Sequence, residues 1–335
     1  MSLHVMRCSL RRAAGAALAA LIVSSSFSAA DPLPSWRAGE VKTRIVDFVA
    51  AVTDPGAESY VTPADRIAVF DNDGTLWAEK PVYFQFLFAL DRLKELAEAD
   101  PSILTSNLLR AAAAGDMEAV AASGTEGILE IVLVTHSGLS VEAFIAESRA
   151  WLDKATHPKT GMAYDGMVYQ PMLELLRYLR DEGFSTYIVS GGGIHFLRAF
   201  AEETYGIPAN QVIGSTGKAR YEVIDGEPTI LKDPGIFFLD DKAGKPLAID
   251  TRIGKRPIFA AGNSDGDFEM LEWTTSGDGS RFGLLIHHTD AEREWAYDRD
   301  SHVGKLERGL DEGPERGWLI VDMAADWAQV WPDPK

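Results

Sequence analysis

The chain has 335 residues, of which 46% are hydrophobic, and its formal net charge at pH 7 is −18. This length and apolar content are sufficient for a complete hydrophobic core, in one large domain or two smaller ones. The acidic balance argues against a nucleic-acid partner, because proteins that bind a phosphate backbone usually carry a basic patch.

The first 30 residues differ from the rest of the chain. Arg7, Arg11 and Arg12 precede the apolar run AAGAALAALIVSSSF, and the small residues 28–30 resemble a cleavage site, which is typical of a secretory signal peptide. The alternative is a membrane anchor, but an apolar run of about 15 residues is shorter than the roughly 20 that span a bilayer. We predict a signal peptide over residues 1–30 and a periplasmic or secreted mature protein without membrane contact. General secretion is favoured, although the arginine pair leaves twin-arginine export open.

The only cysteine, Cys8, lies within this segment. The mature chain would therefore contain no thiol, which excludes disulfide bonds and thiol catalysis. Cleavage would also remove three arginines and no acidic residue, so the mature protein would be more acidic still.

Several short apolar runs end in small or polar residues and are typical of strands buried on both faces, as in a parallel sheet. These runs cover residues 66–70, 185–190, 211–215, 256–262 and 282–288. Residues 169–183 have helical spacing, with Pro171 near the start and Gly183 just past the end. The pattern predicts an α/β fold with a doubly wound parallel sheet, whose ligands bind beyond the carboxyl ends of the strands.

The segment between the first two predicted strands is too long for a single crossover helix. It is rich in Ala, Leu and Glu, and we expect helices over residues 81–99, 102–123, 126–138 and 141–155. We therefore predict a helical cap domain at 77–157, inserted into a core domain formed by 31–76 and 158–335. The Asp-Gly pair within residues 219–233 predicts a hairpin.

Two acids follow the first predicted strand. Asp71 and Asp73 precede a turn at Gly74 and Thr75, so both carboxylates should stand in the crevice at the carboxyl edge of the sheet. Such neighbours repel each other, at a cost on the order of several kcal/mol if they are desolvated and unpaired. Mg²⁺, which prefers oxygen ligands, would relieve the repulsion and hold a phosphate oxygen. Asp71 then suits a nucleophile and Asp73 a general acid and base, whereas an isolated pair of this kind is more often a solvated turn.

Two further segments support a site at this edge. Ser190 and Gly191 begin a glycine-rich turn that opens a helix, where free backbone N–H groups favour an anion. We expect Ser190 to donate a hydrogen bond to a phosphoryl oxygen, although a simple helix cap is the alternative. Asn263, Asp265 and Asp267 follow the fourth predicted strand, and their oxygens again indicate a metal site.

A cation is needed to balance the phosphoryl and aspartate charges. Lys245 should lie at the start of a short helix on the catalytic side, whereas Lys255 precedes the fourth predicted strand at its opposite, amino edge. We predict that Lys245 binds the phosphoryl group, and the alternative for either lysine is a solvated surface position.

The order of these motifs resembles the haloacid dehalogenase superfamily, in its phosphoserine phosphatase-like branch with a helical cap. The resemblance rests on DNDGTL after the first strand, a serine after the second, a lysine before the fourth and GNSDGD after it, and it extends from Arg66 to about Thr289. It implies an aspartyl-phosphate mechanism: Asp71 attacks phosphorus, and Asp73 protonates the leaving alcohol and then activates water. The acid at position 73 favours phosphoryl transfer over dehalogenation.

The resemblance also implies that Mg²⁺ is bound by Asp71, by the backbone carbonyl of Asp73 and by an acid of the last motif. This chain has Asn263 where the family often has an aspartate, and Asp267 matches the second acid of the motif. Whether Asn263 or Asp267 is the inner ligand stays open. Glu79 lies near the position at which phosphoserine phosphatases place an acid that meets the substrate amine.

We therefore expect an exported, Mg²⁺-dependent phosphomonoesterase that hydrolyses small phosphate esters. Two alternatives stay open: a narrow phosphoserine or phosphocholine phosphatase, and a catalytically silent ligand-binding protein. His195, just after the glycine turn, either contacts the substrate or has a structural role, and we favour the structural role.

Overall fold

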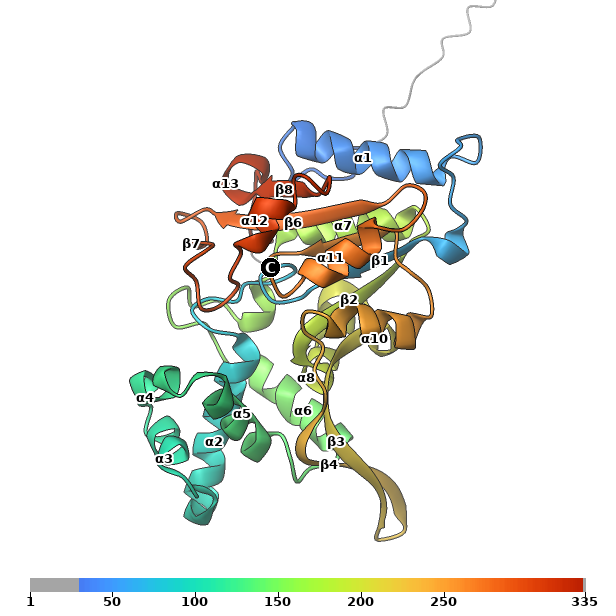
Figure 1. The fold of residues 1–335 in the computed structure, drawn as a ribbon. Helices are drawn as coiled ribbons and strands as arrows, with labels where there is room; N and C mark the ends of the chain where they lie inside the picture. Colours follow the sequence, from blue (N-terminus) through green and yellow to red (C-terminus); the bar gives the residue numbers. More distant parts are fainter. Residues whose placement is uncertain (1–29, 334–335) are drawn as a thin grey trace, which may run out of the picture. The chain divides into compact units, whose positions relative to one another are not determined.

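The computed structural model describes residues 30–333, so the predicted signal peptide lies outside the described residues except for Ala30. Within the described residues, eight strands form one sheet in the order β4-β3-β2-β1-β5-β6-β7, with β8 beside β6 (Figure 1). Neighbouring strands are parallel except for the pairs β3–β4 and β6–β7. The strands are β1 (Ile67–Phe70), β2 (Ser185–Gly193), β3 (Val212–Ile224), β4 (Glu227–Phe238), β5 (Phe259–Gly262), β6 (Phe282–Thr289), β7 (Ala296–Tyr297) and β8 (Leu319–Asp322).

The predicted α/β fold with a mainly parallel sheet is confirmed, because the five predicted strands correspond to β1, β2, β3, β5 and β6. Successive residues of β1 point to opposite faces: Ala68 and Phe70 join one apolar core, and Ile67 and Val69 join another. Both faces of the sheet are therefore covered, which is why this strand has no polar residue.

Helices from distant parts of the chain build these two cores. On the face of Phe70 lie α1 (Glu40–Thr53) and α7 (Gln170–Asp181), the second of which was predicted over 169–183. On the face of Val69 lie α10 (Gly244–Ile253) and α11 (Phe268–Thr275).

The long segment between β1 and β2 is a helical insertion, as predicted. Its helices are α2 (Phe84–Ala99), α3 (Asn107–Ala113), α4 (Met117–Ala122), α5 (Gly124–Thr135) and α6 (Val141–Leu152). The single helix predicted at 102–123 is wrong, because the side chains of Ser106 and Asp116 cap two separate helices, α3 and α4. Helices α2 to α5 share a small apolar core of their own, while the domain boundary at 77–157 stays a prediction.

The predicted hairpin is present and extends well beyond residues 219–233. Its turn lies at Asp225 and Gly226, which both have positive φ angles of 52° and 88°, as the tight hairpin turn that favours Asp-Gly requires. The hairpin is tied to the insertion, because the backbone of Lys232 donates to Leu139 O (2.8 Å) and accepts from Gly138 N (2.9 Å).

Short elements complete the described chain. They are α8 (Ile194–Arg198), α9 (Ala201–Tyr205), α12 (Arg308–Glu312) and α13 (Met323–Asp326). No helix among residues 30–333 has the length and apolar character needed to cross a membrane.

Candidate active site

Three parallel strands bring the predicted site together at one edge of the sheet. Phe70 at the end of β1 pairs with Ile188 of β2 on one side and with Ala261 of β5 on the other. Asp71 continues the ladder, because its backbone N–H donates to Ala261 O (2.9 Å). The carboxyl ends of all three strands therefore lie side by side, as the rule for parallel sheets requires.

The turn after β1 is tightly closed by its own backbone. Asn72 O accepts hydrogen bonds from the backbone N–H groups of the next turn residues, at 2.8 Å from Leu76 N. Gly74 has a φ of 74°, and a Cβ placed there would lie 2.0 Å from Asn263 Nδ2. Only glycine fits this position, for reasons of both conformation and space. Trp77 Nε1 donates to Asp73 Oδ1 (2.8 Å), which fixes the second acid of the pair.

Lys245, near the start of α10, lies between two acids. Its Nζ donates to Asp71 Oδ1 (2.6 Å), Asp267 Oδ1 (2.5 Å) and Val189 O (2.9 Å), and its side chain is only 2% exposed. Burial opposes its charge, but Asp267 and Asp71 more than compensate and raise the pKa of Lys245 above its ordinary value. Lys255, in contrast, is exposed and pairs with Asp65 (2.7 Å).

The loop after β5 separates its acids. Asp267 Oδ2 accepts from Asn263 N and Ser264 N, both at 3.0 Å, so its carboxylate is held inward toward Lys245. Asp265 turns away and accepts from the backbone N–H groups at the start of α12, including Gly309 N (3.0 Å). The expectation that Asp265 marks a metal site is therefore wrong, because its carboxylate is a helix cap.

Buried acids outnumber cations at this edge. Burial, with Asp267 and Asp73 adding to it, raises the pKa of the Asp71 carboxyl well above its ordinary value, although Lys245 opposes the shift. Burial likewise raises the pKa of Asp73. Burial raises the pKa of Asp240 to about 7, and neither of its carboxylate oxygens has a hydrogen-bond partner in the described part of the chain.

This excess of acid, all of it oxygen donors, fits a hard divalent cation such as Mg²⁺. The carboxylates of Asp71 and Asp267 lie close together, because the Lys245 ammonium contacts both. The Asn263 oxygen faces Thr75 Oγ1 (3.2 Å). Among residues 30–333, no cluster of three or more His, Cys, Asp or Glu side chains is arranged as a metal site.

The glycine turn forms the end of β2 and leads directly into α8, whose N-cap is Gly193, so the predicted glycine turn before a helix is confirmed. The strand continues to Gly193, with a bulge between Ser190 and Gly193. Ser190 Oγ accepts from Gly192 N (3.1 Å), so its own hydroxyl proton stays available for a ligand. Gly193 N donates to Gln85 Oε1 (2.7 Å), and Gln85 Nε2 lies 3.0 Å from His136 Nε2.

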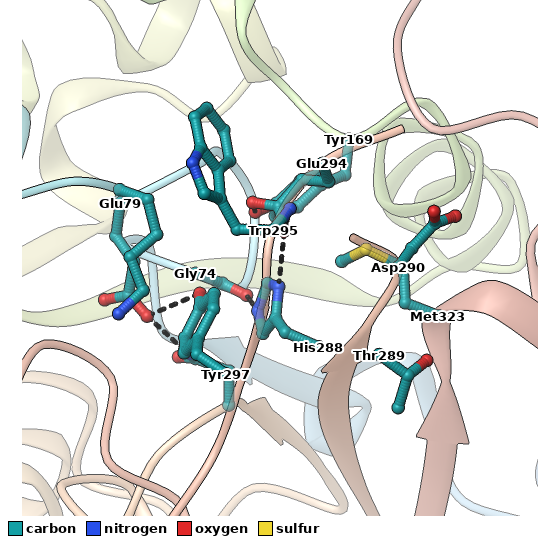
Figure 2. A network of polar contacts seen from close by, with 12 residues as sticks. Gly74, Glu79, Tyr169, His288, Thr289, Asp290, Glu294, Trp295, Tyr297 and Met323 are labelled. Carbon is teal, nitrogen blue, oxygen red and sulfur yellow. Dashed lines mark hydrogen bonds and ion pairs between the residues drawn. The ribbon is translucent and has the colours of Figure 1, made fainter. Parts of the chain in front are cut away.

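A buried polar network supports the turn from the other side (Figure 2). His288 Nε2 donates to Gly74 O (2.8 Å), and its Nδ1 lies 3.2 Å from Glu294 Oε2. Glu294 also accepts from Tyr169 OH (2.9 Å) and Trp295 N (2.6 Å). Both ring nitrogens of His288 thus lie beside oxygen atoms, and the ring links Gly74 to Glu294.

Glu79 links this network to the loop after β5. Its Oε1 accepts from Tyr297 OH and from Asn263 Nδ2, both at 2.8 Å (Figure 2 shows the first). Burial raises the pKa of Glu79 to about 7, while the charge of His288 works against that shift.

A cavity of about 400 Å³ opens over the site. This volume lies within the roughly 300–1,000 Å³ that is common for small-molecule pockets. Its lining includes Asp71, Asp73, Gly191, Lys245 and Asp267 from the core, together with residues of α2, α5 and the β3–β4 hairpin.

The structure thus brings together the residues predicted for the site except Asp265, although their roles stay predictions. Ser190 and Asn263 are buried and do not line the cavity, whereas the residues that follow them, Gly191 and Ser264, do. Sequence reasoning missed three residues of the site: Gln85, Lys232 and Asp240. Only Asp240 has a local signal, because it begins an acidic pair shortly before Lys245.

A family model described as haloacid dehalogenase-like hydrolase matches residues 68–272. No curated protein sequence matches the chain at a significant level.

The chain is similar to several solved structures, of which three are described here. A conserved protein of unknown function from Anaerococcus prevotii has 19% identity and a TM-score of 0.49, over 75% of this chain and 86% of its own. A protein of unknown function from Bordetella pertussis has 17% identity and a TM-score of 0.48, over 77% and 98%. A phosphoserine phosphohydrolase-like protein from Francisella tularensis has 17% identity and a TM-score of 0.36, over 75% and 98%. At these scores the three similarities carry no argument about function.

Proposed function

The chain belongs to the haloacid dehalogenase-like hydrolases, and from this premise we propose that it is an exported, Mg²⁺-dependent phosphomonoesterase acting on small phosphate esters. The observation that carries the proposal is the position of Asp71. It follows β1 at the floor of a small-molecule cavity and contacts the buried Lys245 at 2.6 Å.

The proposed reaction has two steps. Asp71 attacks phosphorus and forms an acyl phosphate, while the bond from phosphorus to the ester oxygen breaks and Asp73 gives the leaving alcohol its proton. A water molecule then attacks the phosphorus, Asp73 takes its proton, and the acyl phosphate bond breaks to release inorganic phosphate and restore Asp71. Covalent catalysis of this kind splits one difficult displacement into two easier ones.

Other groups of the site hold the phosphoryl oxygens. Ser190 has a free hydroxyl proton, because its oxygen already accepts from Gly192 N. The ammonium of Lys245 lies beside the attacking carboxylate. Cations and fixed donors at a phosphoryl group stabilise the charge of the transition state.

Mg²⁺ would be held by Asp71, the backbone carbonyl of Asp73 and the Asp267 or Asn263 side chain. When bound, it supplies positive charge that offsets the repulsion between the acids and the phosphoryl group.

A test uses a chromogenic aryl phosphate with Mg²⁺ present or chelated. We expect hydrolysis by the wild type with Mg²⁺, and a loss of about 10³-fold or more in kcat for Asp71→Asn, because an amide cannot act as the nucleophile. The matched control is Asp65→Asn, an exposed acid at the opposite edge of the sheet that pairs with Lys255. It should retain wild-type kcat.

Equal activity of Asp71→Asn and the wild type would rule out the covalent step. Absence of hydrolysis under all conditions would favour the silent binding protein. A panel that includes phosphoserine and phosphocholine separates a broad phosphatase from the narrow alternatives, which would each hydrolyse a single ester efficiently.

A further inference from the structure

The cavity extends beyond the reactive end into a part with mostly apolar walls. These walls come from α5, α6, α8 and the end of the hairpin, and they include Ile128, Val132, Phe144, Phe196, Ile236 and Leu239. Apolar walls favour the organic part of a ligand rather than its phosphate. Two polar side chains, Lys232 and His195, lie among them.

Lys232 is a buried cation without a carboxylate partner. The residue is 8% exposed, and its Nζ contacts His195 Nδ1 at 3.2 Å and the Phe144 ring at 4.4 Å from the centroid. Within residues 30–333 it forms no ion pair. The adjacent Asp233 is not an ion-pair partner of Lys232, because its carboxylate pairs with Arg220.

Backbone hydrogen bonds between the hairpin and the insertion fix the position of Lys232. Lys232 is bonded through its N–H and C=O to Leu139 and Gly138 in the insertion, so hairpin and insertion hold it jointly. Burying an unpaired charge is strongly unfavourable. An ammonium has three donors, and only one makes a hydrogen bond here, to His195. At least one donor is therefore left for a ligand in the cavity.

Building on the phosphatase function, we propose that Lys232 binds a carboxylate carried by the organic part of the substrate. The preferred substrates are then phosphate monoesters with an apolar body and an acidic group at the end remote from the phosphate. A carboxylate fits better than a second phosphate, because one ammonium beside a histidine balances one negative charge.

The test compares aryl phosphates that differ only at the remote end. The phosphate esters of 4-hydroxybenzoate, 4-hydroxyphenylacetate and 3-(4-hydroxyphenyl)propanoate vary the reach, and each is paired with its neutral carboxamide. Bisphosphorylated analogues form a third arm. The variant is Lys232→Met, and the control is Lys218→Met, which removes an exposed lysine of the same hairpin outside the cavity wall.

We expect the wild type and Lys218→Met to favour at least one carboxylate over its carboxamide by about 10- to 100-fold in kcat/KM, as charge-assisted hydrogen bonds provide. Lys232→Met should abolish that preference and leave the carboxamides within about threefold of wild type. The inference is overturned if no carboxylate is preferred, if the bisphosphates are preferred instead, or if Lys232→Met slows acids and amides equally.

Titration calorimetry with non-hydrolysable benzylphosphonates, carboxylate against carboxamide, separates this inference from the phosphatase function. A carboxylate preference in binding that Lys232→Met removes supports the inference even where no ester is hydrolysed. Equal binding of acid and amide by the wild type overturns it, even where esters are hydrolysed.

The pH dependence gives a second measurement of the same preference. Burial lowers the pKa of Lys232 to about 8, so its cation is present below that pH and is lost above it. Burial first, and then the charge of Lys232, lowers the pKa values of His195 to about 4 and of His136 to about 3, so both imidazoles are neutral throughout. Glu142 of α6 opposes the lowering of the pKa of His195, but burial and the charge of Lys232 have larger effects. The acid-to-amide ratio of kcat/KM should therefore fall as pH rises through 8, and a flat ratio between pH 6.5 and 9.5 would contradict this.

Discussion

Lys245 shows how a single side chain makes this arrangement of acids possible. Its ammonium separates Asp71 from Asp267, and all three groups are buried. An ion pair in such surroundings is not in itself strongly stabilising, but removal of one partner leaves uncompensated charge. The lysine is therefore structural before any substrate arrives.

Replacing Lys245 with methionine should lower the free energy of unfolding by about 3–5 kcal/mol at pH 7, because two buried acids lose their shared partner. Denaturant titration in the presence of a chelator, so that no added cation replaces the ammonium, measures this. Lys255→Met is the matched control: its pair with Asp65 is exposed, and its unfolding midpoint should not move. Equal midpoints for the two variants would show that the buried contacts of Lys245 are dispensable.

The sequence allowed us to predict the site residues that directly follow strands. It did not indicate the positions of residues that depend on contacts with distant parts of the chain. Asp71 and Asn263 directly follow apolar runs, and Lys245 was separable from Lys255 by the edge of the sheet at which each should lie. Asp265 stands in the same loop as Asp267, but its partner is the start of α12, some forty residues later. Lys232 sits in a hairpin whose neighbouring residues are largely exposed, and no local pattern indicates its burial.

At the scale of elements, the helical insertion has an apolar core separate from those of the sheet. Leu93, Leu109 and Ile131 are fully buried in it, and none of them belongs to either cluster that covers the sheet. Separate cores can open separately, because local stability depends on local apolar burial.

Leu109→Ala should increase hydrogen exchange in α2 to α5 while leaving the amides of β1 and β5 protected. Such a truncation typically costs about 2–5 kcal/mol. Leu176→Ala, at an equally buried position in the core beside the sheet, should instead increase exchange in the strands. Exchange that increases everywhere in both variants would mean that the chain unfolds as one cooperative unit.

Strands with long apolar runs were predictable, whereas β8 was missed. Its sequence, LIVD, is short and lies in a tail that contains proline and tryptophan. Its place in the sheet depends on pairing with β6, from Leu284 opposite Leu319 onward. A pairing of this kind is a long-range contact that local periodicity does not report. The helical insertion was evident from its length and composition, but the break between α3 and α4 depends on two caps inside an Ala-rich run.

At the scale of the whole molecule, the proposed export makes a prediction about the mature chain. If residues 1–30 are a signal peptide, cells that express the full sequence should contain a mature form that begins at Asp31, because cleavage follows the small residues 28–30. Intact-mass measurement of the protein from the extracytoplasmic fraction tests this. An uncleaved protein confined to the cytoplasm would exclude the export proposal without affecting the assignment of the site.

His288, which contacts the turn after β1, has a consequence for fragments of this protein. His288 and its partner Glu294 both follow α11 in the chain, yet His288 holds the carbonyl of Gly74, the residue directly after Asp73. A truncation after α11 would keep Asp71, Ser190, Lys245 and Asp267. It would still lose the contact of His288 with Gly74, which supports the loop that carries Asp73. A minimal version of this protein must therefore retain the polypeptide at least through Tyr297, whose hydroxyl anchors Glu79.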